Sequence, residues 1–232
     1  SGTVSFANGV LTANFNVLIK GDLIAETNET FRVVIYEAVL TSASPNITNT
    51  QNLATSTLTV LTDDTGISIA DSSIVESDSN QTMNFTVTRS GDLSGASSMT
   101  WTLFNGTTAA GDFSGATTGT VSFAAGESSK TISITVVGDT TPEADETFTV
   151  QLSNLSGIDE AIDISAAGVI TNDDSAFAIA GTTASTAESS SQTFTITRTH
   201  STNQSQTINW SVLTGGANGT VDAADFGGSL PS

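Results

Sequence analysis

The chain has 232 residues, and 24 acidic against 5 basic side chains give it a formal net charge of −19. A surplus of this sign repels phosphate backbones and anionic lipid head groups, which argues against nucleic-acid binding and membrane-surface binding. The absence of cysteine excludes disulfides, zinc-thiolate sites and cysteine nucleophiles. The sequence also lacks a run of about 18 apolar residues, the pattern that would predict a membrane-spanning helix.

An internal repeat organises the chain from its first residues onward. Residues 2–7 recur without change at 119–124, displaced by 117 residues, and residues 85–89 return nearly unchanged at 194–198, displaced by 109. The repeat predicts the rear half of one unit at 1–65, a complete unit at 66–175 and the front half of a third unit at 176–232.

The phase of this repeat leaves half a unit at each end. Two explanations stay open: the repeats continue in a longer chain, or neighbouring chains complete the halves by strand donation. A half unit exposes sheet edges and half of a core, so neither end is expected to be stable alone.

Alternation of apolar and polar residues predicts half-buried strands in the complete unit. In chain order they cover 82–89, 98–104, 120–123, 130–137, 146–152 and 164–171. Six or seven short antiparallel strands in about 110 residues predict an all-β fold of tandem immunoglobulin-like antiparallel β-sandwiches. The 130–137 strand is expected to be central because Ile132, Ile134 and Val136 fall on one of its faces.

Acidic residues gather in the loops between these strands, where proteins place ligands for hard cations. In the complete unit they are Glu76, Asp112, Asp139, Glu143, Asp145, Glu146, Asp173 and Asp174. In an immunoglobulin-like strand order these positions fall at one end of the sandwich, next to the following unit. Carboxylates crowded there repel one another unless a cation intervenes, which indicates a divalent metal. The spacing of 139–146 recurs at 22–29, which favours a metal site over solvated turns.

The complete unit resembles the Calx-beta domain, a family found in sodium/calcium exchangers, an integrin cytoplasmic tail and many large bacterial surface proteins. The resemblance runs through 111–113, 119–127, 130–137, 139–148 and 170–174, and it extends to both flanking halves by repetition. It implies an immunoglobulin-like sandwich with a Ca²⁺ site at one tip.

The resemblance also implies which residues bind calcium. In the complete unit the ligands would be Glu76, Asp112, Asp139, Glu143, Asp173 and Asp174, in the first unit Asp22, Glu26, Asp63 and Asp64, and in the third unit Glu188 and Asp225. Gly138 and Gly21 stand where high-affinity members often carry another Asp, and Asn172 and Thr62 replace an acid before the terminal pair. Fewer charges predict dissociation constants of about 10⁻⁴ to 10⁻³ M, which suit high extracellular calcium.

These features predict a calcium-binding structural or adhesive module of a secreted or cell-surface protein, in which calcium rigidifies the junctions of a stalk, adhesin or fibre. The expected partners are neighbouring repeats of the same or identical chains and a cell-surface or matrix ligand. Two alternatives stay open: a regulatory calcium sensor, and a self-assembling filament subunit.

The remaining candidates for chemistry give no reason to expect an enzyme, because no nucleophile or phosphate-binding loop accompanies them. Trp101 and Trp210 occupy equivalent strand positions and are expected in the core. Arg89 and Arg198 recur at strand ends, where pairing with loop acids and solvation are both open. The residues expected on the surface are His200, Asp92, Asp159, Glu160 and Asp163.

Overall fold

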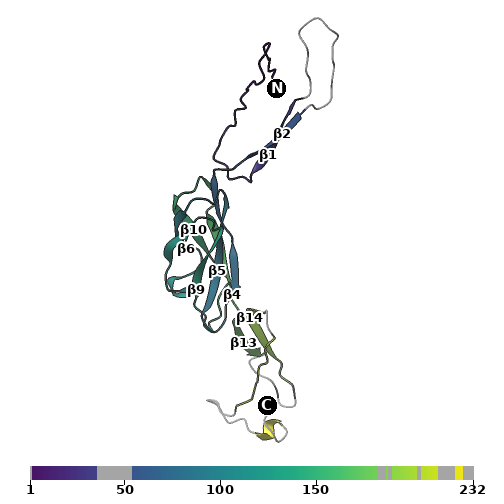
Figure 1. The fold of residues 1–232 in the computed structure, drawn as a ribbon. Helices are drawn as coiled ribbons and strands as arrows, with labels where there is room; N and C mark the ends of the chain where they lie inside the picture. Colours follow the sequence, from purple (N-terminus) through teal and green to yellow (C-terminus); the bar gives the residue numbers. More distant parts are fainter. Residues whose placement is uncertain are drawn as a thin grey trace.

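The computed structural model describes residues 2–35, 54–181, 187, 190–202, 205–213 and 223–226. A hairpin lies at each end of a central β-sandwich, and the three parts follow one another in a row (Figure 1). The N-terminal hairpin joins β1 (Glu29–Ile35) to β2 (Ala54–Val60), and the C-terminal hairpin joins β13 (Ser175–Gly181) to β14 (Phe194–His200). Within the described ranges, the chain has no helix long and apolar enough to span a bilayer.

The central sandwich consists of two five-stranded sheets, with strand orders β4-β12-β10-β6-β8 and β11-β3-β5-β9-β7. The strands are β3 (Thr65–Ile69), β4 (Ser72–Val75), β5 (Gln81–Gly91), β6 (Ser97–Asn105), β7 (Phe113–Ser114), β8 (Thr118–Phe123), β9 (Ser129–Val136), β10 (Glu146–Ser156), β11 (Glu160–Asp163) and β12 (Ser165–Thr171). Short 3-10 turns lie at η1 (Ala110–Asp112) and η2 (Ala223–Phe226). The all-β prediction is therefore confirmed, and each expected strand is present.

The core lies between the two sheets, because the period of two directs every second side chain inward. In β5 the residues Met83, Phe85 and Val87 are buried and alternate with exposed polar residues. Phe148 of the facing sheet packs edge-on against Phe85, with ring centroids 5.8 Å apart. Burial of this alternating series holds the strand register, since a slip of one residue would turn the apolar set toward water.

One detail of the sheets differs from the sequence prediction. The edge strands β4 and β11 pair in parallel with β12 and β3, whereas antiparallel pairing was expected throughout. Strand β9 lies inside its sheet, as expected, with β5 on one side and the two-residue β7 on the other.

The half units expose side chains whose counterparts in the central sandwich are buried. Ile69 is 3% exposed, but Ile179 at the equivalent position of β13 is 63% exposed. The tryptophans behave in the same way: Trp101 is 8% exposed, as predicted, whereas Trp210 is 55% exposed. The core prediction for Trp210 was wrong because no second sheet covers its segment among the described residues, so the apolar faces of both hairpins remain open to solvent.

Arg89 is buried and not solvated, and it forms no ion pair with a loop acid in the part of the chain that the structure describes, although its charge adds to the side-chain hydrogen bonds that lower the pKa of Asp92 and Glu127. Its side chain continues the inward series of β5 and is only 2% exposed. Its guanidinium donates to the carbonyls of Gly95 at 2.8 Å, Leu93 at 3.0 Å and Ala124 at 3.2 Å, and lies 5.4 Å from the ring centroid of Phe123. Arg89 therefore ties the loop before β6 to the end of β8 by charge-assisted hydrogen bonds.

Candidate metal centre

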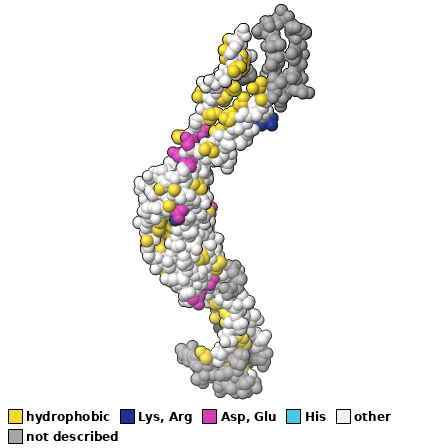
Figure 2. All heavy atoms as spheres, in the orientation of Figure 1, with side chains coloured by type: hydrophobic (Ala, Val, Ile, Leu, Met, Phe, Trp, Pro, Cys, Tyr) yellow, Lys and Arg dark blue, Asp and Glu magenta, His cyan; other side chains and the backbone are white. Residues whose placement is uncertain are grey.

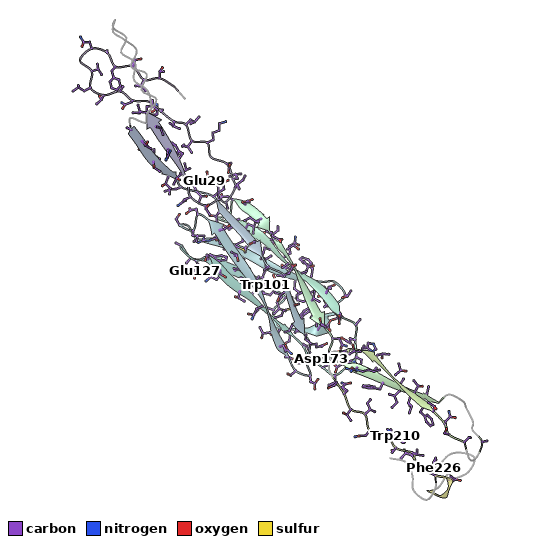
Figure 3. All side chains as sticks on the ribbon, turned by 90° about the vertical axis from the view of Figure 1, so that its right-hand side faces the viewer. Glu29, Trp101, Glu127, Asp173, Trp210 and Phe226 are labelled. Atoms are coloured by element: carbon purple, nitrogen blue, oxygen red, sulfur yellow. The ribbon has the colours of Figure 1, made fainter. Side chains whose placement is uncertain are left out.

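The strand pairings bring distant acidic loops to one end of the central sandwich. Parallel pairing of β4 with β12 continues into a hydrogen bond from the Glu76 amide to the Thr171 carbonyl, at 2.9 Å. Glu76 therefore lies beside the segment that carries Asp173, the residue marked at the β13 end of the sandwich in Figure 3. Pairing of β7 with β9 continues into a hydrogen bond from the Val137 amide to the Asp112 carbonyl, also at 2.9 Å, which places Asp112 beside the loop after β9.

Three carboxylates of this end come close enough to share one cation. One oxygen from each of Asp112, Glu143 and Glu146 lies within 4.8 Å of the other two. Burial raises the pKa of Glu146 to about 7, and a hydrogen bond with the Asp112 carboxyl and the negative charges of Asp112, Glu143 and Glu76 add to the shift. A divalent cation bound between these oxygens would offset the repulsion that raises this pKa.

Glu76 lies among a second group of acids at the same end. Burial raises its pKa to about 7, and the charges of Asp139, Glu143, Asp173 and Asp174 raise it further in that order. Burial and the charges of Asp173, Asp78 and Asp139 likewise raise the pKa of Asp174. The carboxylates proposed from the sequence for this unit thus act on one another in a single cluster.

The cluster contains buried oxygens with no hydrogen-bond donor. Asp173 Oδ1 and Asp174 Oδ2 are both buried and accept no hydrogen bond among the described residues. Leaving such an oxygen unpaired costs at least about 1–3 kcal/mol, and more when it is charged. Calcium takes six to eight oxygen ligands, largely from carboxylates, so this donor set fits a hard divalent cation.

Asn172 and Asp145 arrange the loops of the cluster. The Asn172 side chain donates to the Asp174 carbonyl at 2.9 Å and accepts from the Asp174 amide at 3.2 Å, while the Asn172 amide donates to Asp145 at 3.1 Å. Asn172 is buried. The resemblance suggested that this position lacks an acidic ligand, but in the structure the uncharged Asn172 side chain fixes the loop conformation through these hydrogen bonds.

Gly138 occupies a position where an acidic side chain has no room. A Cβ atom there would lie 1.8 Å from the Ser77 carbonyl oxygen and 2.6 Å from that of Ser79. At Gly21, the equivalent residue of the first unit, nothing lies within 4 Å of the same atom. The departure from Asp at Gly138 therefore follows from close packing of the loop at Ser77, whereas Gly21 leaves space for an acid.

The sequence prediction covers the other units less completely. In the first unit Asp22 and Asp63 lie near Asp64, and their charges raise its pKa after burial, the largest cause, while Glu26 is exposed in the same segment. In the third unit Asp225 is exposed in η2, beside the residue marked Phe226 in Figure 3 and away from Asp173. Glu188 lies outside the described residues.

Asp78, Asp159 and Glu160 belong to these clusters although the sequence analysis did not propose them as ligands. Glu146 also lies at the central site: the sequence analysis named it among the loop acids that indicate a metal, but it was not among the ligands that the resemblance implies. Asp159 is exposed in a bend, as expected, whereas Glu160 is half-buried at the start of β11. The charges of both residues act on Asp64 across the junction with the first unit, which the sequence did not predict because recurrence within a repeat carries no information on contacts between repeats. Figure 2 shows acidic side chains gathered at both ends of the central sandwich.

Comparisons with known proteins identify the family. The Calx-beta domain profile matches residues 1–65 and 61–175. The chain belongs to the Calx-beta family. Adhesion G-protein coupled receptor V1 of Danio rerio is 30% identical over 154 residues, which are 66% of this chain and 2% of that receptor.

Solved Calx-beta domains resemble about half of the chain. The apo-form Calx CBD1 domain has 28% identity and a TM-score of 0.43, and covers 48% of this chain and 100% of its own. The calcium binding domain CBD12 of CALX1.1 has 30% identity and a TM-score of 0.42, and covers 48% of this chain and 49% of its own.

The raised pKa values of this Calx-beta unit predict how its stability depends on pH without divalent cations. Glu76 and Glu146 have an ordinary pKa of 4.5 and reach about 7 in the folded chain, so between these values the folded chain holds protons that the unfolded chain has lost. The free energy of unfolding in EDTA is therefore expected to fall as the pH rises from about 5 to about 7.5.

Thermal melts in EDTA across this range check the expectation. Glu127, whose pKa is lowered chiefly by its hydrogen bond with Lys130, titrates below the window and does not contribute. The E76Q variant is expected to show a shallower fall. A melting temperature that rises with pH in EDTA would contradict the account.

Proposed function

We propose that this chain is a calcium-binding, non-enzymatic structural segment of an extracellular protein, in which calcium stiffens the junctions between successive Calx-beta repeats. The observation that carries the proposal is the carboxylate cluster at the end of the central sandwich, with its buried oxygens on Asp173 and Asp174 that no donor satisfies. The cluster adjoins the third repeat, because the Ser201 amide of that repeat donates to the Asp174 carbonyl at 3.0 Å.

The names of the relatives support the extracellular and calcium-binding parts of this proposal. One is named as an adhesion receptor, and one solved structure is titled a calcium binding domain. The chain spans 2% of the receptor, so adhesion, bacterial origin and surface location are proposals for this protein. They agree with a net charge of −19, since millimolar calcium outside cells suits weak acidic sites.

The domain division at 1–65, 66–175 and 176–232 is part of this proposal, as is the partner set. Successive repeats of the same or identical chains are the primary partners, and a cell-surface or matrix ligand is the second. Calcium ordered at each tip fixes the angle between one repeat and the next, which turns a flexible string into an extended rod.

Small-angle X-ray scattering of the whole chain tests this function. The maximum dimension is expected to increase when calcium replaces EGTA, because ordered junctions hold the repeats in a row. Magnesium is the matched control, since it demands a stricter octahedral geometry and keeps several waters. Equal dimensions in calcium and EGTA would count against the rod.

The uncovered faces of the hairpins favour a second candidate function, assembly of copies by mutual completion. A groove of about 720 Å³ lies against the N-terminal hairpin, lined by residues that include Phe15, Ile19, Phe31 and Leu58. In the central sandwich the counterparts of β1 and β13, strands β10 and β3, belong to opposite sheets of one core. Strand β13 of a second copy therefore matches the face that β1 leaves open. A scattering mass that stays monomeric at high concentration would exclude this assembly.

A further inference from the structure

The first repeat contacts the central sandwich at the end where Figure 3 marks Glu29, away from Asp173. The Ala25 amide of the first repeat donates to Glu160 Oε2 of the sandwich at 2.8 Å, and both residues are half-buried. Glu160 begins the edge strand β11, which pairs with β3 directly after the segment that joins the two repeats. Ala25 is therefore a defined point of contact between one repeat and the next.

Two glycines of the central sandwich approach the methyl group of Ala25. A Cβ on Gly66 would lie 2.8 Å from the Ala25 Cβ and 2.7 Å from Ile162 Cδ1, and a Cβ on Gly91 would lie 3.0 Å from the Ala25 Cβ. Carbon atoms in favourable contact lie about 3.5–4.0 Å apart, so a side chain at either glycine would push Ala25 away. We call the surface formed by Gly66, Gly91, Glu160 and Ile162 the glycine socket.

The segment that joins the two repeats is fixed beside the glycine socket. The Asp92 amide donates to the Asp64 carbonyl at 2.8 Å, and Thr65 Oγ1 donates to the Asp92 carbonyl at 2.7 Å. Gly91, the last residue of β5, has a φ of 74°, a left-handed conformation that favours glycine. A residue seated in the socket therefore holds the first repeat at a second point, close to the segment that already tethers it.

The second junction carries different residues at the positions that form the socket. Alignment of the repeats places Pro142, Ala176 and His200 at the positions of Ala25, Gly66 and Gly91. Proline has no N–H group to donate, and alanine and histidine carry the Cβ atom for which the first junction has no room. The glycine socket is therefore a property of the first junction and not of every junction in the chain.

Both junctions nevertheless share the turn of the joining segment. The Ser201 amide donates to the Asp174 carbonyl at 3.0 Å, as the Asp92 amide does to the Asp64 carbonyl. His200 has a φ of 67°, close to that of its counterpart glycine in the second repeat. The backbone path is thus the same at both places, and the residues of the socket are what differs.

We propose that the glycine socket selects the repeat that precedes the central sandwich and holds the first junction in one orientation without calcium. The partner that fits is a Calx-beta repeat with a small residue and a backbone N–H group at the position of Ala25. The second junction has no such socket, so its order depends on calcium. Only this last step rests on the proposed function.

Distances between pairs of spin labels, measured by double electron–electron resonance on the whole chain, test the socket. The chain has no cysteine, so introduced cysteines alone carry the labels. T59C/T131C spans the first junction and T131C/T197C spans the second, and all three positions are exposed. In EGTA the first pair is expected to give a narrow distance distribution, and the second pair a broad one that narrows in calcium, because repeats joined by small interfaces move unless a contact fixes them.

Variants at the socket show whether it holds the first junction. G66A adds the methyl group that meets Ala25, and A25P removes the N–H donor, so each is expected to broaden the first distribution in EGTA toward that of the second. A25G/G66A is expected to narrow it again, because one methyl group makes room for the other, and Ile162 Cδ1 is the end of a side chain that can rotate. G21A is the matched control, since nothing lies within 4 Å of its Cβ.

The outcomes separate the socket from the proposed function. A first distribution in EGTA as broad as the second, or one that G66A and A25P broaden no more than G21A does, overturns the socket. A narrow first distribution together with a second one that calcium does not narrow supports the socket and counts against calcium as the stiffening agent.

Discussion

Saturating calcium is expected to raise the melting temperature of the central sandwich by roughly 10 °C. A ligand that binds only the folded state adds about 2.7 kcal/mol when present at a hundred times its Kd, and 1 kcal/mol corresponds to about 4 °C in a domain of this size. The gain comes from replacing repulsion among Glu76, Asp173 and Asp174 by ion ligation. Differential scanning calorimetry in calcium and in EGTA measures it.

Two single variants separate ion binding from general charge effects. E76Q is expected to melt higher than the unmodified chain in EGTA, because a buried like charge is removed, and to lose most of the increase in calcium. E127Q removes a charge at the other end of the sandwich, where Glu127 pairs with Lys130 at 2.8 Å (Figure 3). It is expected to keep the full calcium increment, and an equal loss in both variants would count against a localised site.

Replacing Arg89 by alanine is expected to destabilise the central sandwich by about 3 kcal/mol or more. The change leaves the carbonyls of Gly95, Leu93 and Ala124 without their donor, and it opens a cavity beside Phe123. Urea unfolding with and without calcium measures the loss, which is expected in both conditions because Arg89 lies away from the acidic cluster.

Lys130 provides the control for Arg89. It is a basic residue with an exposed ion pair to Glu127, and such pairs contribute about 0–1 kcal/mol. K130A is therefore expected to leave the free energy of unfolding nearly unchanged. A loss below about 1 kcal/mol for R89A would show that the buried guanidinium does not hold its loop.

The strands of the central unit were predictable because each long strand buries one face. Met83, Phe85 and Val87 alternate with polar residues, and this pattern survives in the structure. The edge strands β4 and β11 escaped prediction because each has only four residues and buries none of them fully, so the sequence carries no long apolar alternation there. Arg89 extends the inward series of β5 by one step, so its burial was readable from register, although its residue type suggested the surface.

The closeness of the acidic residues at one end of the central sandwich depends on the order in which the strands pair, which the sequence only implied. Recurrence of Asp139 and Glu143 as Asp22 and Glu26 marked them for one role, but their closeness to Glu76 follows from the parallel pairing of β4 with β12. Contacts between repeats, such as the hydrogen bond from the Ala25 amide to Glu160, join residues 135 positions apart in different units, and no periodicity within a repeat reports them.

Isothermal titration of calcium into the whole chain, compared with its E76Q/D173N variant, tests the central claim most directly. The account predicts binding with a Kd of about 10⁻⁴ to 10⁻³ M and loss of the central site in the variant. Micromolar affinity would instead favour a regulatory sensor. No calcium-dependent heat, or identical binding by the chain and the variant, would contradict a calcium site at the end of the sandwich.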